Sequence, residues 1–272
     1  MDKFLRQTAN DLVYYTIPSF SATGLVVNGF SGRKGGVSPR PYESLNLSLL
    51  TDDKPENVLE NRRRFTEALG IKTENLVSAK QVHGAQIVKV NVAHRGKGSC
   101  DSVSAIPGTD ALMTNEKGLA LMAFFADCVP VLFLDPVKKA IAISHAGWKG
   151  TVARIAAKTV KAMQEAYGTE PSQLLAAIGP SVGPCHYEVD EPVIAKFKEA
   201  FPGKENQLMS YAGKAGHRQL NLWEANVLQL KEAGLKEGNI TVAGLCTFCQ
   251  QEEFFSHRAG MAGRQAAVLM LR

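Results

Sequence analysis

FFADCVPVLFLDPVKKAIAISHAGWKGT, residues 124–151, combines two apolar runs with a cysteine, an aspartate and a histidine. Two apolar runs flank a polar turn at 135–139, so we expect strands over 119–134 and 140–145, paired as a hairpin. Cys128 lies seven residues before the turn and His145 six residues after it. The two side chains should therefore approach each other across the hairpin, although Pro130 interrupts the regular ladder.

A cysteine and a histidine at neighbouring strand ends fit either a nucleophilic pair or two ligands of one metal ion. The structural alternative is that Cys128 packs as a small apolar side chain and His145 bonds to the backbone. His83, in KQVHG at 80–84, also ends a strand-like run. With it, two histidines and one cysteine would hold Zn²⁺ and leave a fourth position for water, as in catalytic zinc sites. Asp127 is then a candidate acid/base or acceptor for a ligand.

Composition indicates an ordinary globular chain. Its 272 residues are 45% hydrophobic and 21% charged, with a net charge of +5 that suits a small anionic substrate without requiring one. Basic residues are mixed with acidic ones, so we expect no nucleic-acid surface. We also expect no membrane partner, since the longest apolar stretch, 119–134, is interrupted. Five cysteines and no signal-like N-terminus predict a cytoplasmic protein with free thiols or metal ligands.

Many apolar runs and few, unevenly spaced helices favour packed sheets flanked by helices in one domain, 1–272. Helices are predicted at 55–69, 152–167, 191–200 and 222–233. Strands are predicted at 24–30, 76–82, 85–90, 119–125, 130–134, 140–144, 174–178, 240–245 and 266–271. The Gly/Ser/Pro-rich segments 31–45 and 91–109 are predicted to be long loops.

Arg62 falls on the apolar stripe of helix 55–69, together with Val58, Phe65 and Leu69. A charge that faces inward needs a partner or an anion. Arg62 therefore either extends to solvent or pairs with a buried carboxylate, or it holds a phosphate or a substrate carboxylate.

Four weaker candidates lie elsewhere in the chain. Trp148 follows a Gly-rich turn that could favour an anion, and its ring either stacks on a flat ligand or simply packs. Asn46, in SLNLS, bonds a ligand or its own turn. Cys246-Thr-Phe-Cys249 is half a zinc motif, and a thiol pair is the favoured interpretation. Cys185-His186 lines a cleft or belongs to a tight turn.

KQVHG, FADCVP and SHAGWKGT resemble the zinc-binding segments of the laccase-domain proteins, also called multicopper polyphenol oxidase-like proteins. The resemblance extends in order through SLNLS (44–48), ENRRR (60–64), GPSVGPCHYEV (179–189), NLWEAN (221–226) and CTFCQQEEFFSHRAGMAGR (246–264). It is strongest for the bacterial members associated with purine nucleosides. It implies an α+β fold, a four-layer α-β-β-α sandwich in a single domain, with His83, Cys128 and His145 as zinc ligands.

The resemblance also implies a function. It is a zinc-dependent purine nucleoside phosphorylase and adenosine deaminase, acting on adenosine, inosine and methylthioadenosine with phosphate as co-substrate. Arg62 matches an arginine of the family pattern and becomes the preferred holder of phosphate or ribose. Cys128, Arg62 and Asp127 are then the catalytic candidates, and Arg62, Asn46 and Trp148 the substrate-binding ones.

Three alternatives stay open at this stage. One is an amide hydrolase that edits a cell-wall precursor, with Cys128 as nucleophile or zinc ligand. Another is a copper-dependent polyphenol oxidase, which six histidines disfavour because a multicopper site consumes many more. The third is a binding protein whose zinc only joins strands.

Overall fold

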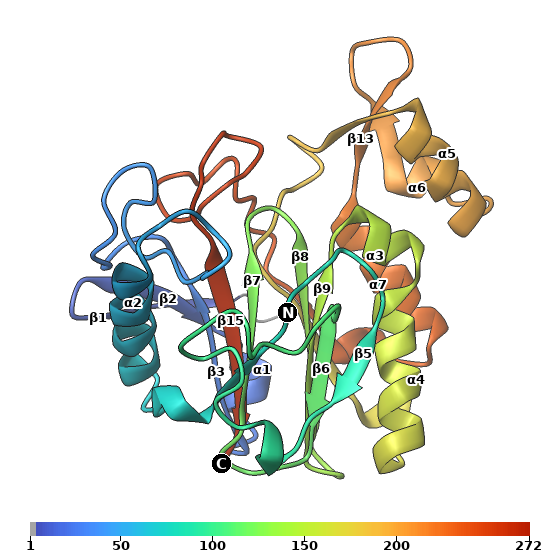
Figure 1. Ribbon diagram of the computed structural model, residues 1–272. Helices are drawn as coiled ribbons and strands as arrows, with labels where there is room; N and C mark the ends of the chain where they lie inside the picture. The colour runs from blue at the N-terminus through green and yellow to red at the C-terminus, as the bar shows by residue number, and fades with distance from the viewer. Residues whose placement is uncertain (1–3) are drawn as a thin grey trace.

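Two six-stranded sheets stack face to face in the computed structural model, which describes residues 4–272 (Figure 1). The first sheet, in the order β1-β2-β3-β15-β7-β4, contains β1 (Leu5–Ala9), β2 (Leu12–Thr16), β3 (Val26–Ser31), β15 (Gln265–Leu271), β7 (Ala120–Phe125) and β4 (Leu76–Ser78). The second sheet, in the order β14-β10-β8-β9-β6-β5, contains β14 (Ile240–Val242), β10 (Leu175–Ile178), β8 (Val129–Asp135), β9 (Ala140–Ala146), β6 (Ala111–Thr114) and β5 (Ile87–Lys89).

Helices cover both outer faces of this pair of sheets (Figure 1). Helix α2 (Pro55–Ala68) packs on the first sheet, and α4 (Ile155–Tyr167) and α7 (Leu222–Glu232) pack on the second. The remaining helices are α1 (Pro18–Ser21), α3 (Trp148–Val152), α5 (Glu191–Ala200) and α6 (Glu205–Leu208), and single 3₁₀ turns occupy Thr73–Asn75, Val92–His94, Pro171–Gln173 and Glu237–Asn239. The expected α+β sandwich of four layers is confirmed.

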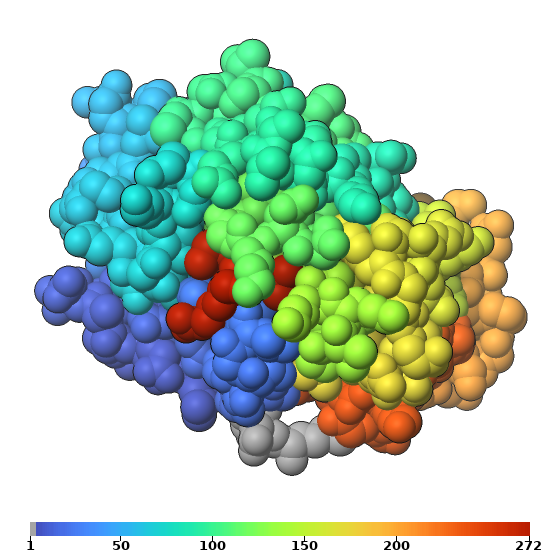
Figure 2. All heavy atoms as spheres, turned by 90° about the horizontal axis from the view of Figure 1, so that it is seen from below, coloured from blue at the N-terminus to red at the C-terminus, as the bar shows by residue number. Residues whose placement is uncertain are grey.

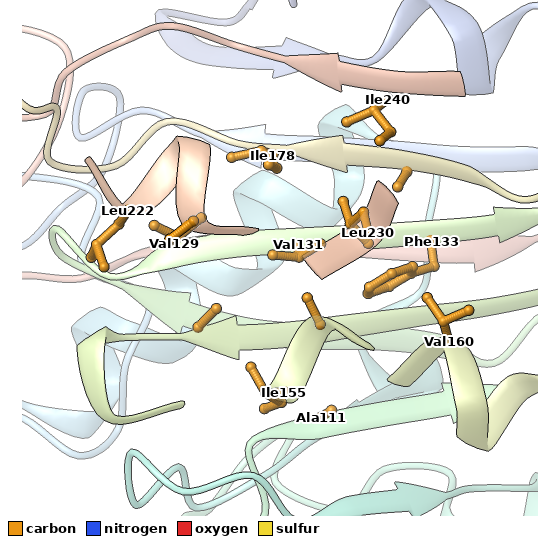
Figure 3. Close-up of a cluster of buried hydrophobic side chains, with 14 of the residues drawn as sticks. Ala111, Val129, Val131, Phe133, Ile155, Val160, Ile178, Leu222, Leu230 and Ile240 are labelled. Carbon is orange, nitrogen blue, oxygen red and sulfur yellow. The ribbon is translucent and has the colours of Figure 1, made fainter. Parts of the chain in front are cut away.

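Strand alternation builds three apolar interfaces from these layers. On β7, Leu121 and Phe125 point between the sheets, whereas Met122 and Phe124 point toward α2. On β8, Val131 joins the interface with α4 and α7. Figure 3 shows that interface, where side chains of β8 lie among those of both helices. Apart from Asp135 at the end of β8, these two strands are apolar at every residue, because both of their faces are covered.

The hairpin expected around the turn at 135–139 is present as β8 and β9, with Pro130 opposite His145. The expectation that 119–134 forms one strand of that hairpin is wrong. Residues 120–125 form β7, which pairs with β15 and β4 in the other sheet. Asp127, with a φ of 81°, turns the chain between the two sheets, so Cys128 lies where they meet.

Helix predictions hold where the sequence carries an end signal. α2 and α5 match within one residue at each end, and Gly70, with a φ of 66°, ends α2 as expected. The predicted helix 152–167 instead divides into α3 and α4, because Arg154 adopts a left-handed φ of 64°. α3 begins four residues earlier, at Trp148, and packs close to Gly84 through Gly150. Periodicity cannot reveal such a change of direction, which tertiary packing imposes.

Six short strands were not predicted: β1, β2, β6, and the three-stranded sheet β11 (Glu188–Asp190), β13 (His217–Leu220) and β12 (Met209–Tyr211). That small sheet carries α5 and α6 and lies at the upper right of Figure 1. Seen from below, the end of β15 is bordered by N-terminal segments in blue and central segments in green (Figure 2). There Gly118 and Arg272 pair with Leu271 and Leu25. No helix among residues 4–272 is long and apolar enough to cross a membrane.

Candidate metal centre

His83, Cys128 and His145 meet where the chain passes from β7 to β8 and where β9 ends, and each offers a ligand atom within 4.8 Å of the others. The Cys128 Sγ atom lies 3.9 Å from His83 Nδ1, and the two imidazole rings are 4.8 Å apart at their centroids. We call these three residues the triad cluster. The structure thus brings together side chains that are far apart in the sequence.

Local backbone geometry explains how the triad cluster assembles. His145 is fixed at the end of β9 by its pairing with Pro130, and His83 adopts a left-handed φ of 60° in the turn after β4. Gly147 then passes close behind the cluster. A Cβ atom there would lie 3.0 Å from Cys128 Sγ and 3.2 Å from His83 Nδ1, so only glycine fits without displacement.

Asp110, which was not among the predicted site residues, supports His83 and His145 through hydrogen bonds. Its Oδ1 atom accepts a hydrogen bond from His145 Nδ1 at 2.9 Å and from the His83 N–H at 3.0 Å. Its Oδ2 atom accepts from the N–H groups of Val82 and Gly84, at 3.2 Å and 2.7 Å. With Nδ1 engaged, the Nε2 atom of His145 is left to bind an ion. A lone aspartate before a four-residue strand carries no signal in the sequence.

The charges of the cluster reinforce one another. Burial opposes ionisation of Cys128, but His145 and His83 outweigh it and lower the pKa of the thiol to about 6. Burial likewise opposes protonation of His145, yet Cys128 and Asp110 raise the pKa of its imidazole to about 9. Burial also raises the pKa of Asp110, but His145 and the Gly84 N–H bring it below its usual value. These shifts favour the thiolate of Cys128, the form that binds metals.

The donor set fits a divalent metal ion with an open coordination position. One thiolate and two imidazoles are borderline to soft ligands that suit zinc, and three protein ligands leave room for a further one. The carboxylate behind His145 is the outer partner expected of a metal-binding histidine. The triad cluster also lines a pocket of about 340 Å³, so an ion held there would be reachable by a small molecule.

Other residues lining that pocket include Phe124, Leu50, Gln81, His257 and Arg264. Arg264 brings a positive charge to the wall of the pocket. Burial lowers its pKa, whereas Cys128 and Asp127 oppose that shift. Neither Arg264 nor His257 was singled out as a ligand-binding residue, because the fold brings them to the pocket from a loop more than a hundred residues after Cys128.

Arg62 faces inward as its position on the helix predicts, but it does not line this pocket. It is 1% exposed, and it donates to Leu47 O at 2.8 Å and to Gly98 O and Ser99 O at 2.6 Å and 2.7 Å. Its guanidinium also lies 4.9 Å from the centre of the Phe124 ring. Backbone carbonyls thus take the place of the expected phosphate, and the role of Arg62 in anion binding stays a prediction that these contacts do not favour.

Asp127 is not part of the triad cluster and does not line its pocket. It accepts hydrogen bonds from the Thr247 hydroxyl and from the backbone N–H of Arg258, both at 2.6 Å. Through these two hydrogen bonds, its carboxylate anchors the C-terminal loops beside Cys128. Its proposed acid/base role stays a prediction, and these contacts favour a structural one.

Asn46 and Trp148 also lie outside the pocket. Asn46 is fully buried, and its Oδ1 atom accepts a hydrogen bond from the backbone N–H of Arg264 at 3.0 Å. It therefore positions the loop that carries Arg264. Trp148 lines a separate, wider hollow of about 640 Å³ together with Tyr187 and Arg258. Direct contact of either side chain with a ligand in the 340 Å³ pocket lined by the triad cluster, the triad pocket, is not supported.

Comparison with known proteins extends over nearly the whole chain. Residues 27–272 match a family described as multi-copper polyphenol oxidoreductase laccase. The chain is 39% identical to the purine nucleoside phosphorylase YlmD of Geobacillus stearothermophilus, over 99% of this chain and 97% of that protein. It is 32% identical to adenosine deaminase RL5 from an unknown prokaryotic organism, over 85% and 88% of the two chains.

Solved structures agree with these matches. The crystal structure of YlmD from Geobacillus stearothermophilus superposes with a TM-score of 0.93 and covers all of both chains at 39% identity. The hypothetical protein YfiH of Bacillus licheniformis superposes with a TM-score of 0.92 at 36% identity, over 99% of each chain.

Proposed function

The chain belongs to the multi-copper polyphenol oxidoreductase laccase family, and we propose that it is a zinc-dependent purine nucleoside enzyme. The proposed reactions are phosphorolysis of adenosine, inosine and methylthioadenosine to the free base and a ribose 1-phosphate, and deamination of adenosine. Relatives named purine nucleoside phosphorylase and adenosine deaminase support this class of chemistry. The observation that carries the proposal is the triad cluster in the wall of a pocket that also contains Arg264.

His83, Cys128 and His145 would hold the zinc ion, through one thiolate and two imidazole nitrogens. Bound there, zinc would supply Lewis-acid polarisation of a substrate atom or activation of a water molecule. Asp110 keeps both histidines in place through four hydrogen bonds, so the ligands need little rearrangement when substrate arrives.

The pocket offers matching partners for the other parts of a nucleoside and phosphate. Phe124 and Leu50 provide apolar contact for a flat base, and Arg264 provides a positive charge for phosphate. In phosphorolysis a phosphate oxygen bonds to the ribose C1′ as the C1′–N9 bond breaks, and the base leaves with that electron pair. We assign proton exchange with the leaving base to His257, which lines the same pocket.

The test is an assay of the purified zinc-loaded protein with adenosine, with and without phosphate. In phosphate we expect adenine, ribose 1-phosphate and inosine. Without phosphate we expect inosine alone, because deamination consumes only water. Absence of both adenine and inosine under all conditions contradicts the proposal.

Variants of two arginines make the phosphate assignment specific. Arg264→Met should raise KM for phosphate by about tenfold or more, the cost of one charge-assisted contact, while deamination changes less. Arg95→Met removes a charge from an exposed position outside the pocket and should leave both reactions unchanged. Equal loss of deamination and phosphorolysis in Arg264→Met assigns Arg264 to framework and overturns its role with phosphate.

The family description favours one second candidate, copper-dependent oxidation of phenols. A multicopper oxidase needs many histidines, and the chain has six. Two of them contact other side chains, His94 with Asn91 and His217 with Glu188, so the requirement is poorly met. The same protein loaded with copper and supplied with a phenol and oxygen tests this candidate directly.

A further inference from the structure

Cys185, His186, Cys246 and Cys249 place their ligand atoms within 4.8 Å of one another. We propose that these residues, the tetrad cluster, form a second metal site, a structural Zn²⁺ site with three thiolates and one imidazole. It shares no residue with the triad cluster, and it does not depend on the proposed enzymatic activity. Three cysteines and a histidine are one of the common ligand sets of structural zinc.

The fold brings the two halves of the tetrad cluster together. Strands β10 and β14 run parallel, and the pairing continues beyond them as a bridge between Ser181 and Cys246. The Ser181 N–H donates to Leu245 O, and the Thr247 N–H donates to Ser181 O. The two segments therefore leave the sheet side by side, and each then turns back. The C-x-x-C motif at 246–249 thus meets Cys185-His186, for which the sequence left open a cleft-lining position or a tight turn; both residues line the wider hollow beside Trp148.

Distances between the side chains match a tetrahedral ion. The Cys185 and Cys249 Sγ atoms lie 3.5 Å apart, and Cys249 Sγ lies 3.3 Å from His186 Nδ1. Zinc bonds of about 2.3 Å to sulfur and about 2.0 Å to nitrogen require separations of about 3.8 Å and about 3.5 Å at tetrahedral angles. Both observed contacts are within a few tenths of an ångström of those values, so a small adjustment of rotamers suffices.

Neighbouring groups hold the ligands in this arrangement. The His186 ring stacks on Phe248, with centroids 4.3 Å apart and planes inclined by 21°, while its Nδ1 atom faces Cys249. The Gly183 N–H donates to Cys246 Sγ at 3.2 Å, a hydrogen bond that supports a thiolate ligand. A Cβ at Gly183 would lie 2.9 Å from the Trp223 ring, so the glycine permits this close approach.

Two simpler roles for these cysteines fit less well. Apolar packing does not explain Cys185 and Cys249, which are exposed. A disulfide between them requires an S–S distance of about 2.05 Å, well short of the 3.5 Å observed, and it leaves His186 and Cys246 without a role. A metal ion uses all four side chains at once.

An ion in the tetrad cluster would join the loops that frame the triad pocket. Thr247 lies between the two cysteines of the motif, and its hydroxyl donates to Asp127, the neighbour of Cys128. On the other side, Cys185 and His186 begin the segment that leads into β11 and the small sheet. With four protein ligands the ion has no open position, so its role is to stabilise these loops.

Cobalt substitution tests the proposal in the Cys128→Ser variant, which has no thiolate in the triad cluster. Full-length protein is stripped of metal, titrated with Co²⁺ and followed by absorption spectroscopy. We expect a thiolate-to-cobalt charge-transfer band and the ligand-field bands of a tetrahedral ion. Adding Cys249→Ser to this background should weaken the charge-transfer band by about a third, since one of three thiolates is lost, or abolish it if the ion no longer binds.

Cys100→Ser, added to the same background, is the matched control and should leave the spectrum unchanged, because Cys100 is exposed and outside both clusters. Zinc added to the cobalt protein should remove the bands. Absence of any thiolate band in Cys128→Ser overturns the proposal. It is also overturned if the freshly purified native protein has a mass lower by two hydrogen atoms and a disulfide at these cysteines. Both measurements use background proteins without changes in the tetrad cluster, so they remain decisive if Cys249→Ser fails to fold.

Discussion

The triad and tetrad clusters contain the same kinds of donor but differ in number and surroundings. Three donors meet at the junction of the two sheets, backed by the buried carboxylate of Asp110 and facing a pocket. Four donors meet on two turns beside the wider hollow, where Cys185 and Cys249 are exposed and Cys246 is buried, and a backbone N–H and a stacked ring support them. The difference indicates chemistry at the first and mechanical support at the second, because only an incomplete ligand set admits a substrate.

The largest expected effect follows from breaking the triad cluster. Cys128→Ser should lower kcat/KM for phosphorolysis and deamination by about a thousandfold or more, because a bound metal contributes several kcal/mol to the transition state. Cys185→Ser, in the tetrad cluster, should change kcat/KM far less and lower the melting temperature instead. Steady-state assays and thermal unfolding of both variants provide the measurement. Equal losses of activity in the two variants contradict the division of roles.

Replacing Arg62 separates framework from chemistry on the triad side. Arg62→Met leaves three buried carbonyl oxygens without their donor and should lower the free energy of unfolding by about 3 kcal/mol. Arg63→Met, one residue along on the exposed face of α2, should cost less than about 1 kcal/mol. Denaturant titration measures both. Should Arg62→Met raise KM for phosphate without loss of stability, the original prediction of an anion-binding arginine holds instead.

A carboxylate supports the ligands of the triad cluster, whereas within residues 4–272 no carboxylate bonds to the tetrad cluster. Asp110→Asn should weaken zinc binding at the triad cluster by about 10- to 100-fold, the usual cost of losing a partner behind a metal-binding histidine. Competition with a chromophoric chelator measures this. Asp101→Asn, which changes an exposed loop carboxylate, is the control. Unchanged zinc affinity in Asp110→Asn would show that the carboxylate of Asp110 does not support metal binding at the triad cluster.

The smallest expected effect concerns the hydrogen bond that links the two regions. Thr247→Val removes the donor to Asp127 and should lower the free energy of unfolding by about 1 to 2 kcal/mol, with a several-fold loss of kcat/KM. Thr247→Ser keeps the hydroxyl and serves as the control. If both variants have the same stability and the same kcat/KM, the hydrogen bond from the Thr247 hydroxyl does not link the tetrad cluster to the position of Cys128.

Much of the fold was predictable wherever local chemistry and tertiary context agree. α5 begins and ends at the predicted residues 191 and 200, and α2 carries a proline at its first turn and a glycine after its end. The β8–β9 hairpin follows from two apolar runs around a short turn. The change of sheet after β7 was not predictable, since β7 and all of β8 before Asp135 are apolar and the decisive feature is the backbone of Asp127.

Three short motifs were enough to predict the triad residues, and helical periodicity was enough to predict that Arg62 faces inward. The partners of those side chains became evident from the packing of the folded chain. That packing placed Asp110 behind His145, turned Asp127 toward Thr247, supplied Arg62 with carbonyl groups and joined Cys185-His186 to Cys246 and Cys249. Periodicity and spacing describe neighbours along one segment, whereas ligands and hydrogen-bond partners come from segments that only the packing of two sheets brings into contact.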